Sequence, residues 1–430
     1  MTLKREITGP LLLICMIFFV LGFFTWVNAM LIPYFKVACE LTNFESYLVT
    51  FAFYISYLVI ALPASVLLNK VGFKKGMTTG FFLMAAGAFT FIPAAYTRSY
   101  LVFLLGLFII CIGLAILQTA VNPYVTLLGA KERAAQRISI VGICNKTAGI
   151  IAPLLLAAAI IRPGDSQLFN AIPSMPAVEK AAALDMLVRR LILPYAVVGG
   201  VLSLLGVLLR YSTLPEPGAP AGQAALPSAH GTRRVWQYPH VVLGAVAIFL
   251  HVGSQLIAVD TIINYAHAWG LSVPEAKAFP SYTLCTTICG YLLGISLIPW
   301  AVSQLTALKV CTLLGITLSL LVVRLHGAVH FLGHTTDISV WMLVLLGFAN
   351  SMIWAGIWPL ALDGLGPQAK LGASLLIMGL SGNAVLPLIY GRLADVSSHQ
   401  QAYWVLLPCY VFLAFYAFYG HKIKHRTTLQ

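Results

Sequence analysis

The sequence predicts an all-α membrane protein with twelve transmembrane helices in two six-helix bundles. Hydrophobic residues make up 60% of the 430 residues and charged residues only 9%, whereas soluble domains carry about 25% charged residues. Apolar segments of the length that crosses the hydrocarbon core, about 20 residues, recur along the chain. A polar segment rich in proline, glycine and alanine, residues 212–239, interrupts them at mid-chain. Six spans on each side of a flexible linker predict two bundles.

The twelve spans are placed by the apolar runs of the sequence, and their ends are expected to vary by a few residues. They are 11–36, 46–69, 77–97, 100–129, 138–161, 191–210, 240–267, 281–303, 308–326, 338–362, 372–394 and 401–420. The first run is too long for a signal peptide and is expected to stay in the mature protein. Residues 1–211 should form one bundle, 212–239 a cytoplasmic linker and 240–430 the second bundle. The long loop 162–190 is expected to hold a short helix around Ala177–Arg189.

The basic residues gather on one side of the expected membrane. The net charge is +13 at pH 7, but the lysines and arginines do not form one patch of the kind that binds nucleic acid. With a cytoplasmic N-terminus, the inner segments hold most of them, and the outer ones lie mainly in the long loop 162–190. This bias predicts that both termini are cytoplasmic and that the bilayer, not nucleic acid, is the partner.

Catalytic and metal chemistry is not expected. The eight cysteines lie mostly within predicted spans, without the spacing of a metal site, and should pack as small apolar residues. No nucleophile triad, phosphate loop or redox motif occurs. The sequence therefore predicts neither an enzyme nor a bound cofactor or metal.

Polar side chains in the middle of the spans are the candidate substrate site. Gln118 and Asn122 lie four residues apart, so they share one helix face, and Pro123 lets the helix bend beside them. The other candidates are amides and indoles with one lysine: Trp26, Asn28, Asn145, Lys146, Gln255, Asn350, Trp354 and Asn383. Amides match sugar hydroxyls and aromatic rings stack on a pyranose, so this set favours a neutral sugar as the ligand.

Each candidate also has a structural interpretation. A single intramembrane amide often only joins two helices, for about 0.6 kcal/mol. Trp354 and Trp358 also suit packing or an interfacial anchor, and His251 suits an interior histidine with its hydrogen bonds satisfied. Charges at membrane depth are by default functional, which singles out Lys146 and Asp260. Asp260 is the coupling candidate, with a hydrated pairing or capping role as the alternative.

Several strings of the sequence resemble bacterial glucose/galactose transporters of the fucose:proton symporter family, within the major facilitator superfamily. They are FFTWVNAMLIPYFK, TFAFYISYLVIALPASVLLNKVGFKKG, GLAILQTAVNPYVTLLGA, ISIVGICNKTAGIIAPL, VGSQLIAVDTIINY and LLIMGLSGNAVLPLIYG. The loop LLNKVGFKKG is similar to the superfamily's loop motif, with Asn69 near the place of its acidic residue. The resemblance implies uptake of a hexose across the bacterial inner membrane, with the sugar held between the two halves by a monomer.

The resemblance also reveals missing carboxylates. In the fucose permease branch an Asp in span one and a Glu in span four are the protonation sites. This chain has Ala29 and Gln118 in their places. The glucose/galactose branch commonly has a Glu where this chain has Gln255. Since an amide does not titrate, three mechanisms stay open: uniport, proton coupling through Asp260, or sodium coupling through Asp260 and amide oxygens. Uniport or weak coupling is favoured.

Two other functions remain as alternatives. A multidrug or metabolite efflux carrier of the same fold would prefer an apolar cavity with carboxylates. A membrane sugar sensor would bind without transporting. Export of a dye would identify an efflux carrier. Sugar flux into liposomes would exclude a sensor, which binds sugar without transporting it.

Overall fold

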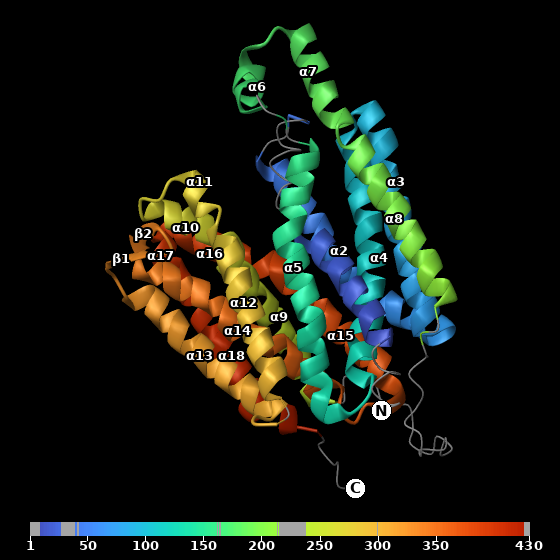
Figure 1. The fold of residues 1–430 in the computed structure, drawn as a ribbon, viewed down its shortest axis with the longest axis vertical. Helices are drawn as coiled ribbons and strands as arrows, with labels where there is room; N and C mark the ends of the chain where they lie inside the picture. Colours follow the sequence, from blue (N-terminus) through green and yellow to red (C-terminus); the bar gives the residue numbers. More distant parts are fainter. Residues whose placement is uncertain are drawn as a thin grey trace. The chain divides into compact units, whose positions relative to one another are not determined.

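A computed structural model describes residues 9–26, 39–40, 43–160, 162, 165–212, 214, 238–298 and 300–424, without the side chains of 43–52, 157, 166, 169, 170, 173, 273, 274 and 367. Within these residues the structure is almost entirely helical, with one two-stranded sheet (Figure 1). Eleven described helices are long and apolar enough to cross a membrane. A further helix, α12 (Phe279–Leu297), occupies the expected eighth span. The predicted multi-span helical fold is therefore confirmed.

The helices of the first half agree with the expected spans within a few residues. They are Gly9–Trp26, α2 (Asn43–Val71), α3 (Phe73–Thr97), α4 (Tyr100–Leu127), α5 (Ala134–Ile160) and α8 (Ile192–Tyr211). The expected loop helix is confirmed as α7 (Ala177–Arg189), and α6 (Asp165–Ala171) precedes it. The remainder of the first expected span, from residue 27, lies outside the described residues.

The helices of the second half contain more interruptions than the sequence predicts. They are α9 (Pro239–Asp260), α10 (Ile262–Ala268), α11 (Val273–Ala276), α12, α13 (Gln304–Arg324), α14 (Ile338–Leu362), α15 (Ala369–Met378), α16 (Gly382–Val396), α17 (His399–Ala402) and α18 (Leu406–Phe418). The sequence predicts one continuous helix over 240–267, but α9 ends at Asp260. The hydroxyl of Thr261 donates to the Ile257 carbonyl over 2.7 Å and competes with the backbone ladder at this break.

The eleventh expected span is divided by a 3₁₀ turn, Gly379–Ser381, between α15 and α16. The two glycines at this point allow the backbones of two helices to approach closely. A Cβ atom on Gly379 would lie 2.7 Å from the Ala245 carbonyl oxygen, and one on Gly382 would overlap the carbonyl oxygen of Phe249. Because α9 packs against this turn, larger residues would push the helices apart.

A short hairpin before α14 is a regular element that the sequence does not predict. Strands β1 (Ala328–Phe331) and β2 (His334–Asp337) pair antiparallel. Leu332 and Gly333 both have positive φ, 50° and 81°, which is typical of a type I′ turn. The usual asparagine–glycine signal is absent, so the turn is not evident from the sequence.

The described helices group into two compact units by proximity of their backbones. One unit holds residues 1–18, 121–147 and 216–430, and the other holds 19–120 and 148–215. The long helices α4 and α5 thus contribute one end to each unit. The division of the chain at residues 211 and 240 stays a prediction, because most of the linker lies outside the described residues.

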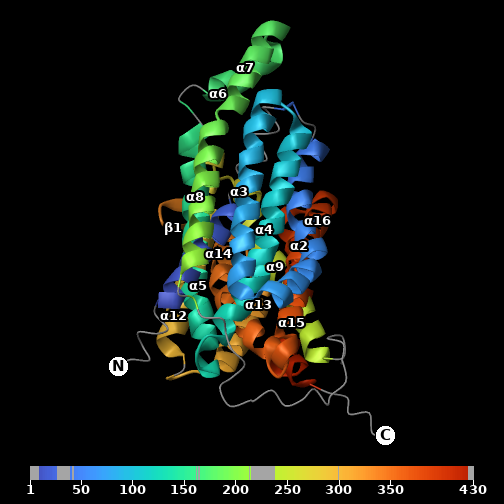
Figure 2. The ribbon, with the colours of Figure 1, turned by 90° about the vertical axis from the view of Figure 1, so that its right-hand side faces the viewer.

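In the second of these units, α3 and α8 lie side by side in both views (Figures 1 and 2). Gly199 and Gly206 of α8 face the rings of Phe89 and Phe82 of α3. Helix α7 continues the line of α8 beyond the end of α3 (Figure 2). Small residues facing aromatic rings are a common way for helices to pack within lipid.

Candidate functional site

Gln118 lies on α4 and is bound to a neighbouring helix. Its side chain is buried, and its Nε2 donates to the hydroxyl of Tyr57 on α2 over 3.0 Å. One turn further along the same helix, Asn122 is 2% exposed. The sequence prediction that both amides point inward is consistent with this burial. Gln118 also makes the helix-to-helix contact that was its alternative role.

Pro123 does not end α4, which continues to Leu127. The carbonyl groups beyond it are bound by Arg137 of α5, which is 6% exposed. Its guanidinium donates to the carbonyls of Val125, Thr126 and Ala130 over 3.0, 2.9 and 2.8 Å. Arg137 therefore satisfies the acceptors that the end of a helix leaves unpaired.

Lys146 and Gln255 form a direct contact, although they are far apart in the sequence. The Nζ of Lys146 on α5 donates to Oε1 of Gln255 on α9 over 2.9 Å. Lys146 is only 6% exposed, and an ammonium group buried in this way requires hydrogen-bond acceptors. The adjacent Asn145 is half-buried and donates to the Phe18 carbonyl over 3.3 Å.

His251 lies one turn from Gln255 and faces Trp354. We call these residues the Lys146 cluster: Lys146, His251, Gln255 and Trp354. His251 is one turn before Gln255 on α9, and its ring centroid is 6.5 Å from that of Trp354 on α14. His251 is 1% exposed, yet its Nδ1 has no hydrogen-bond partner among the described residues. The expectation that the hydrogen bonds of His251 are satisfied is therefore wrong for its Nδ1 atom. The cluster combines a cation, an amide, an imidazole and an indole in one unit.

Other predicted residues lie on helices of the same unit. Asn350 of α14 is fully buried and accepts a 3.0 Å hydrogen bond from the hydroxyl of Tyr410 on α18. Trp354 packs on Trp358 with ring centroids 5.5 Å apart. The side-chain oxygen of Asn383, on α16, is buried without a partner among the described residues.

Trp26 and Asn28 belong to the first expected span. Trp26 is 8% exposed and lies against Gly149 of α5. A Cβ atom added to Gly149 would lie 2.7 Å from the indole ring of Trp26. Asn28 and Ala29 lie outside the described residues. Their places in a substrate site therefore stay predictions.

Asp260 is the last residue of α9 and is exposed. The sequence placed it well within a span, whereas the structure places it where the helix is interrupted. No ion pair of Asp260 occurs among the described residues, and no group of metal-ligating side chains is found among them. Its role in coupling stays a prediction.

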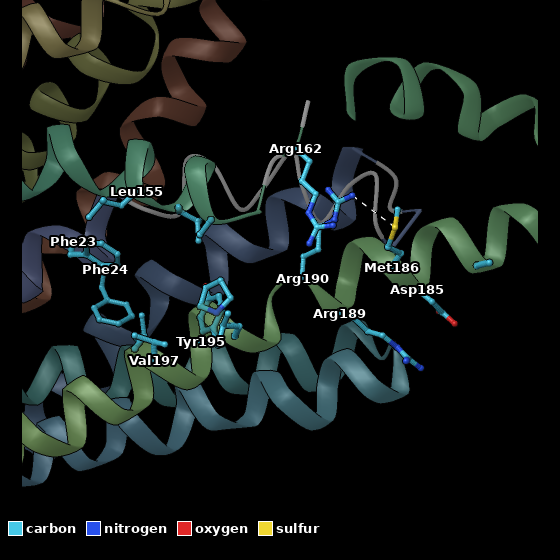
Figure 3. Close-up of a pocket in the computed structure, with 16 residues that line it drawn as sticks. Phe23, Phe24, Leu155, Arg162, Asp185, Met186, Arg189, Arg190, Tyr195 and Val197 are labelled. Carbon is cyan, nitrogen blue, oxygen red and sulfur yellow. Dashed lines mark hydrogen bonds between the residues drawn. The ribbon is translucent and has the colours of Figure 1, made fainter. Parts of the chain in front are cut away.

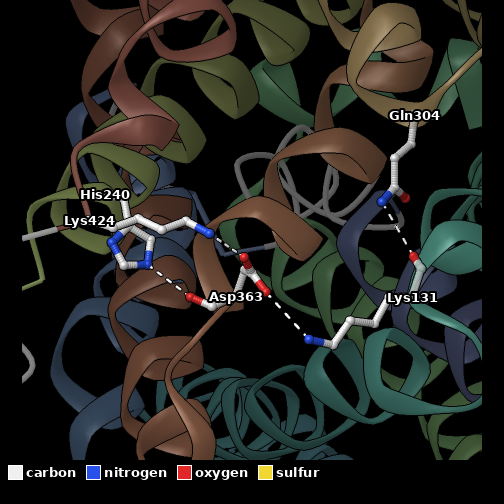
Figure 4. A network of polar contacts seen from close by, with 5 residues as sticks. All are labelled: Lys131, His240, Gln304, Asp363 and Lys424. Atoms are coloured by element: carbon white, nitrogen blue, oxygen red, sulfur yellow. Dashed lines mark hydrogen bonds and ion pairs between the residues drawn. The ribbon is translucent and has the colours of Figure 1, made fainter.

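A polar network that the sequence analysis did not predict lies at the ends of α4, α9 and α14 (Figure 4). We call it the Asp363 cluster: Lys131, His240, Gln304, Asp363 and Lys424. Lys424 donates to the Asp363 carboxylate, and the Nζ of Lys131 lies 3.4 Å from its other oxygen. The His240 ring bonds the Asp363 carbonyl over 3.1 Å.

Gln304 completes the cluster from the start of α13. Its side chain donates to the Lys131 carbonyl over 3.3 Å and accepts from the Ala135 amide over 3.1 Å. The hydrogen bond from Lys424, opposed by partial burial and aided by the charge of Lys131, holds the pKa of Asp363 below its usual value. The cluster thus ties the α4–α5 connection to α13, α14 and the described C-terminal end. An acid directly after a long apolar span, with basic residues in other inter-helix segments, was the available sequence signal.

Comparison with known proteins gives full-length matches. A model of the Major Facilitator Superfamily matches residues 14–388. The glucose/galactose transporter of Brucella abortus is 31% identical over 95% of this chain and 93% of its own length. The L-fucose-proton symporter of Escherichia coli is 28% identical over 92% of this chain and 89% of its own length.

Solved structures agree with these matches. The crystal structure of the E. coli fucose:proton symporter FucP superposes with a TM-score of 0.80 at 25% identity, over 96% of this chain and 98% of that chain. The proton:xylose symporter XylE superposes with a TM-score of 0.64 at 13% identity, over 96% of this chain and 95% of that chain, and so matches in fold alone.

Proposed function

Because the chain belongs to the major facilitator superfamily, we propose that it is a secondary transporter that takes up a hexose by alternating access. It is a multi-pass membrane transporter and not an enzyme, as the sequence predicts. The excess of lysine and arginine in alternate inter-helix segments supports a bacterial inner-membrane location with both termini in the cytoplasm. The protein is proposed to act as a monomer.

The observation that carries the sugar assignment is the Lys146 cluster, supported by the names of the relatives. A buried lysine and imidazole, with a half-buried amide and indole, offer donors, an acceptor and a stacking face. Polar groups of this density within a membrane-spanning protein are expected to serve a ligand. The related proteins are named for glucose/galactose and for L-fucose, which are neutral hexoses.

We propose that the substrate contacts come from both halves of the chain. The first half of the chain would contribute the side chains of Gln118, Asn122, Asn145, Lys146, Trp26 and Asn28. The second half would contribute those of Gln255, Asn350, Trp354 and Asn383. In the conformation described here, Gln118 bonds Tyr57, Asn350 bonds Tyr410 and Lys146 bonds Gln255. These protein partners would exchange with sugar hydroxyls, which costs little because one hydrogen bond replaces another.

We propose that span four does not couple transport to protons. Gln118 occupies the place of the titrating Glu that the family resemblance implies, and its amide donates to Tyr57. Asp260 is left as the coupling carboxylate, exposed at the end of α9. We therefore propose uniport or weak coupling, with Asp260 as the group through which a proton or sodium gradient would act.

The Asp363 cluster supports an alternating-access cycle. It joins segments that precede and follow the central linker, on the side where both termini are proposed to lie. Opening toward the cytoplasm requires that such contacts break, because the α4–α5 connection has to separate from α13 and α14. The cluster is therefore proposed to stabilise the state that is closed to the cytoplasm.

Counterflow in liposomes that contain the pure protein tests the function. Liposomes loaded with one unlabelled sugar are diluted into labelled glucose, galactose, fucose or N-acetylglucosamine, with and without proton and sodium gradients. Transient accumulation of a labelled hexose without a gradient is the expected result. Binding without flux would identify a sensor, and dye export without sugar flux would identify an efflux carrier. A gradient that drives steady accumulation would overturn uniport.

A further inference from the structure

An apolar groove with a basic end lies in the unit formed by residues 19–120 and 148–215 (Figure 3). Its volume is about 990 Å³. Phe23 and Phe24 line one end, and Leu155, Leu193 and Val197 line its length. The last three are exposed by 55%, 72% and 56%, so the groove opens along the surface of the spans. In a membrane-spanning protein this surface faces acyl chains.

Arginines line the other end of the groove, where the side chains of Arg162 and Arg190 point toward one another (Figure 3). The Arg189 side chain points away from them and lies over the Tyr96 ring, 5.9 Å from its centroid. Arg162, Arg189 and Arg190 line it, with Asp185 as the single acidic lining residue. The Asp185 carboxylate already forms an ion pair with Arg98, whose Nη1 lies 3.3 Å from its Oδ1. Arg162 and Arg189 are exposed. The end of the groove therefore carries an excess of positive charge.

Arg190 is held rigidly at this end. Its side chain is 8% exposed and pairs with Asp165 over 2.6 Å, and it also donates to the Ile160 carbonyl over 3.2 Å. Burial would raise the pKa of Asp165, but the bonds from Arg190 and the Arg162 amide hold it below its usual value. The Nε of Arg190 has no hydrogen-bond partner among the described residues. A buried guanidinium nitrogen without a protein acceptor is suited to an anionic ligand.

The position of Arg190, two residues before α8, matches the depth of lipid headgroups. Arg190 precedes Arg210 by about 30 Å of helical rise, which is the thickness of the hydrocarbon core. Leu193 and Val197 follow Arg190 by roughly 5 and 10 Å. The basic end therefore lies at one boundary of the hydrocarbon, and the apolar length extends toward the bilayer centre.

We propose that the groove binds one anionic phospholipid, with its phosphate on Arg162 and Arg190 and an acyl chain along Leu155, Leu193 and Val197. Guanidinium groups bind phosphate with two parallel hydrogen bonds, and basic pockets between transmembrane helices bind anionic headgroups. A sugar is disfavoured by the apolar lining. With both termini cytoplasmic, the lipid belongs to the outer leaflet. The site does not depend on which solute the protein carries.

Native mass spectrometry of the full chain, with lipid added in detergent, tests this site. Phosphatidylglycerol is titrated against phosphatidylcholine and against inorganic phosphate. We expect one phosphatidylglycerol to be retained. The variant Arg162→Gln should retain it roughly fivefold less, because one arginine near an anionic membrane surface contributes about 1 kcal/mol. Arg162 is exposed, so the variant is expected to fold.

Two further variants locate the lipid. Ala159→Trp places a large ring in the groove and should displace the acyl chain while leaving all the arginines in place. Arg324→Gln is the matched control, because Arg324 ends α13, stacks on Trp404 at 5.6 Å and is not a lining residue of the groove. Phosphatidylglycerol retention that is equal in the wild type and Arg162→Gln, or equal to that of phosphatidylcholine, would overturn the proposal. Full displacement by millimolar inorganic phosphate would overturn it in favour of a simple phosphate site.

Discussion

The ammonium of Lys146 and the side-chain carbonyl of Gln255 are 2.9 Å apart, and this contact joins α5 to α9 across more than one hundred residues of sequence. Lys146 is almost completely buried. A buried cation that loses an acceptor loses more free energy than a neutral donor would, since its desolvation is no longer offset. The pair is therefore a sensitive place to test the proposed substrate site.

Replacement of Gln255 by Leu removes this acceptor at similar volume. We expect Gln255→Leu to destabilise the protein by about 1–3 kcal/mol and to reduce hexose counterflow. Thermal unfolding in detergent and the liposome assay measure the two effects. Gln255→Glu is the control that retains an acceptor for Lys146, and its melting temperature should stay near that of the wild type. If Gln255→Leu had the melting temperature and the transport rate of the wild type, the Lys146–Gln255 pair would not be part of the substrate site.

Tyr57 and Gln118 are expected to act as one unit in transport. Gln118→Ala should lower hexose uptake roughly tenfold, which corresponds to about one hydrogen bond. Tyr57→Phe should have a smaller effect, because it removes only the partner that orients the amide. The double variant should be no worse than Gln118→Ala alone, since coupled residues are not additive. Unchanged uptake by a well-expressed Gln118→Ala variant argues against a substrate contact.

The Asp363 cluster should respond to acid. Because the pKa of Asp363 lies below its usual value in the folded protein, its contribution to stability is complete above the unfolded-state pKa of about 3.9. That contribution is lost as the pH falls through the lower folded-state pKa. We expect the wild type to exceed Asp363→Asn by about 0.2–1 kcal/mol near neutral pH, since the group is partly exposed. The melting temperatures of the two proteins should draw together as the pH is lowered from 7 to about 2, and a difference that stays constant would contradict this.

Two glycines of α16 should behave in opposite ways. Gly382 lies against the Phe249 backbone of α9, whereas a methyl group added at Gly391 would meet no atom within 4 Å. Gly382→Ala should therefore destabilise the protein by about 1–3 kcal/mol through overpacking. Gly391→Ala should be neutral or stabilise it by up to about 1 kcal/mol, because alanine favours the helix. Equal melting temperatures for the two variants would show that the close approach is not tightly packed.

Part of the candidate site was predictable from single residues. A buried lysine among apolar residues, and amides four apart on one face, are visible in the sequence because lipid leaves few other places for them. The identity of their partners was not visible. Tyr57 is one of many tyrosines in apolar runs, and Tyr410 is one of several tyrosines in the last span, so nothing in the sequence pairs them with Gln118 and Asn350.

The amino-acid sequence by itself determined the helical membrane fold and the places of most spans, because a segment that crosses hydrocarbon has to be long, apolar and internally hydrogen-bonded. The family resemblance further implies that the amide of Gln118 stands in place of a titrating Glu in span four. Only the tertiary structure decided that Lys146 meets Gln255, that Asp363 gathers Lys131 and Lys424, and that α9 ends at Asp260. Such contacts depend on how distant helices rotate and approach one another, which no local pattern of hydropathy encodes.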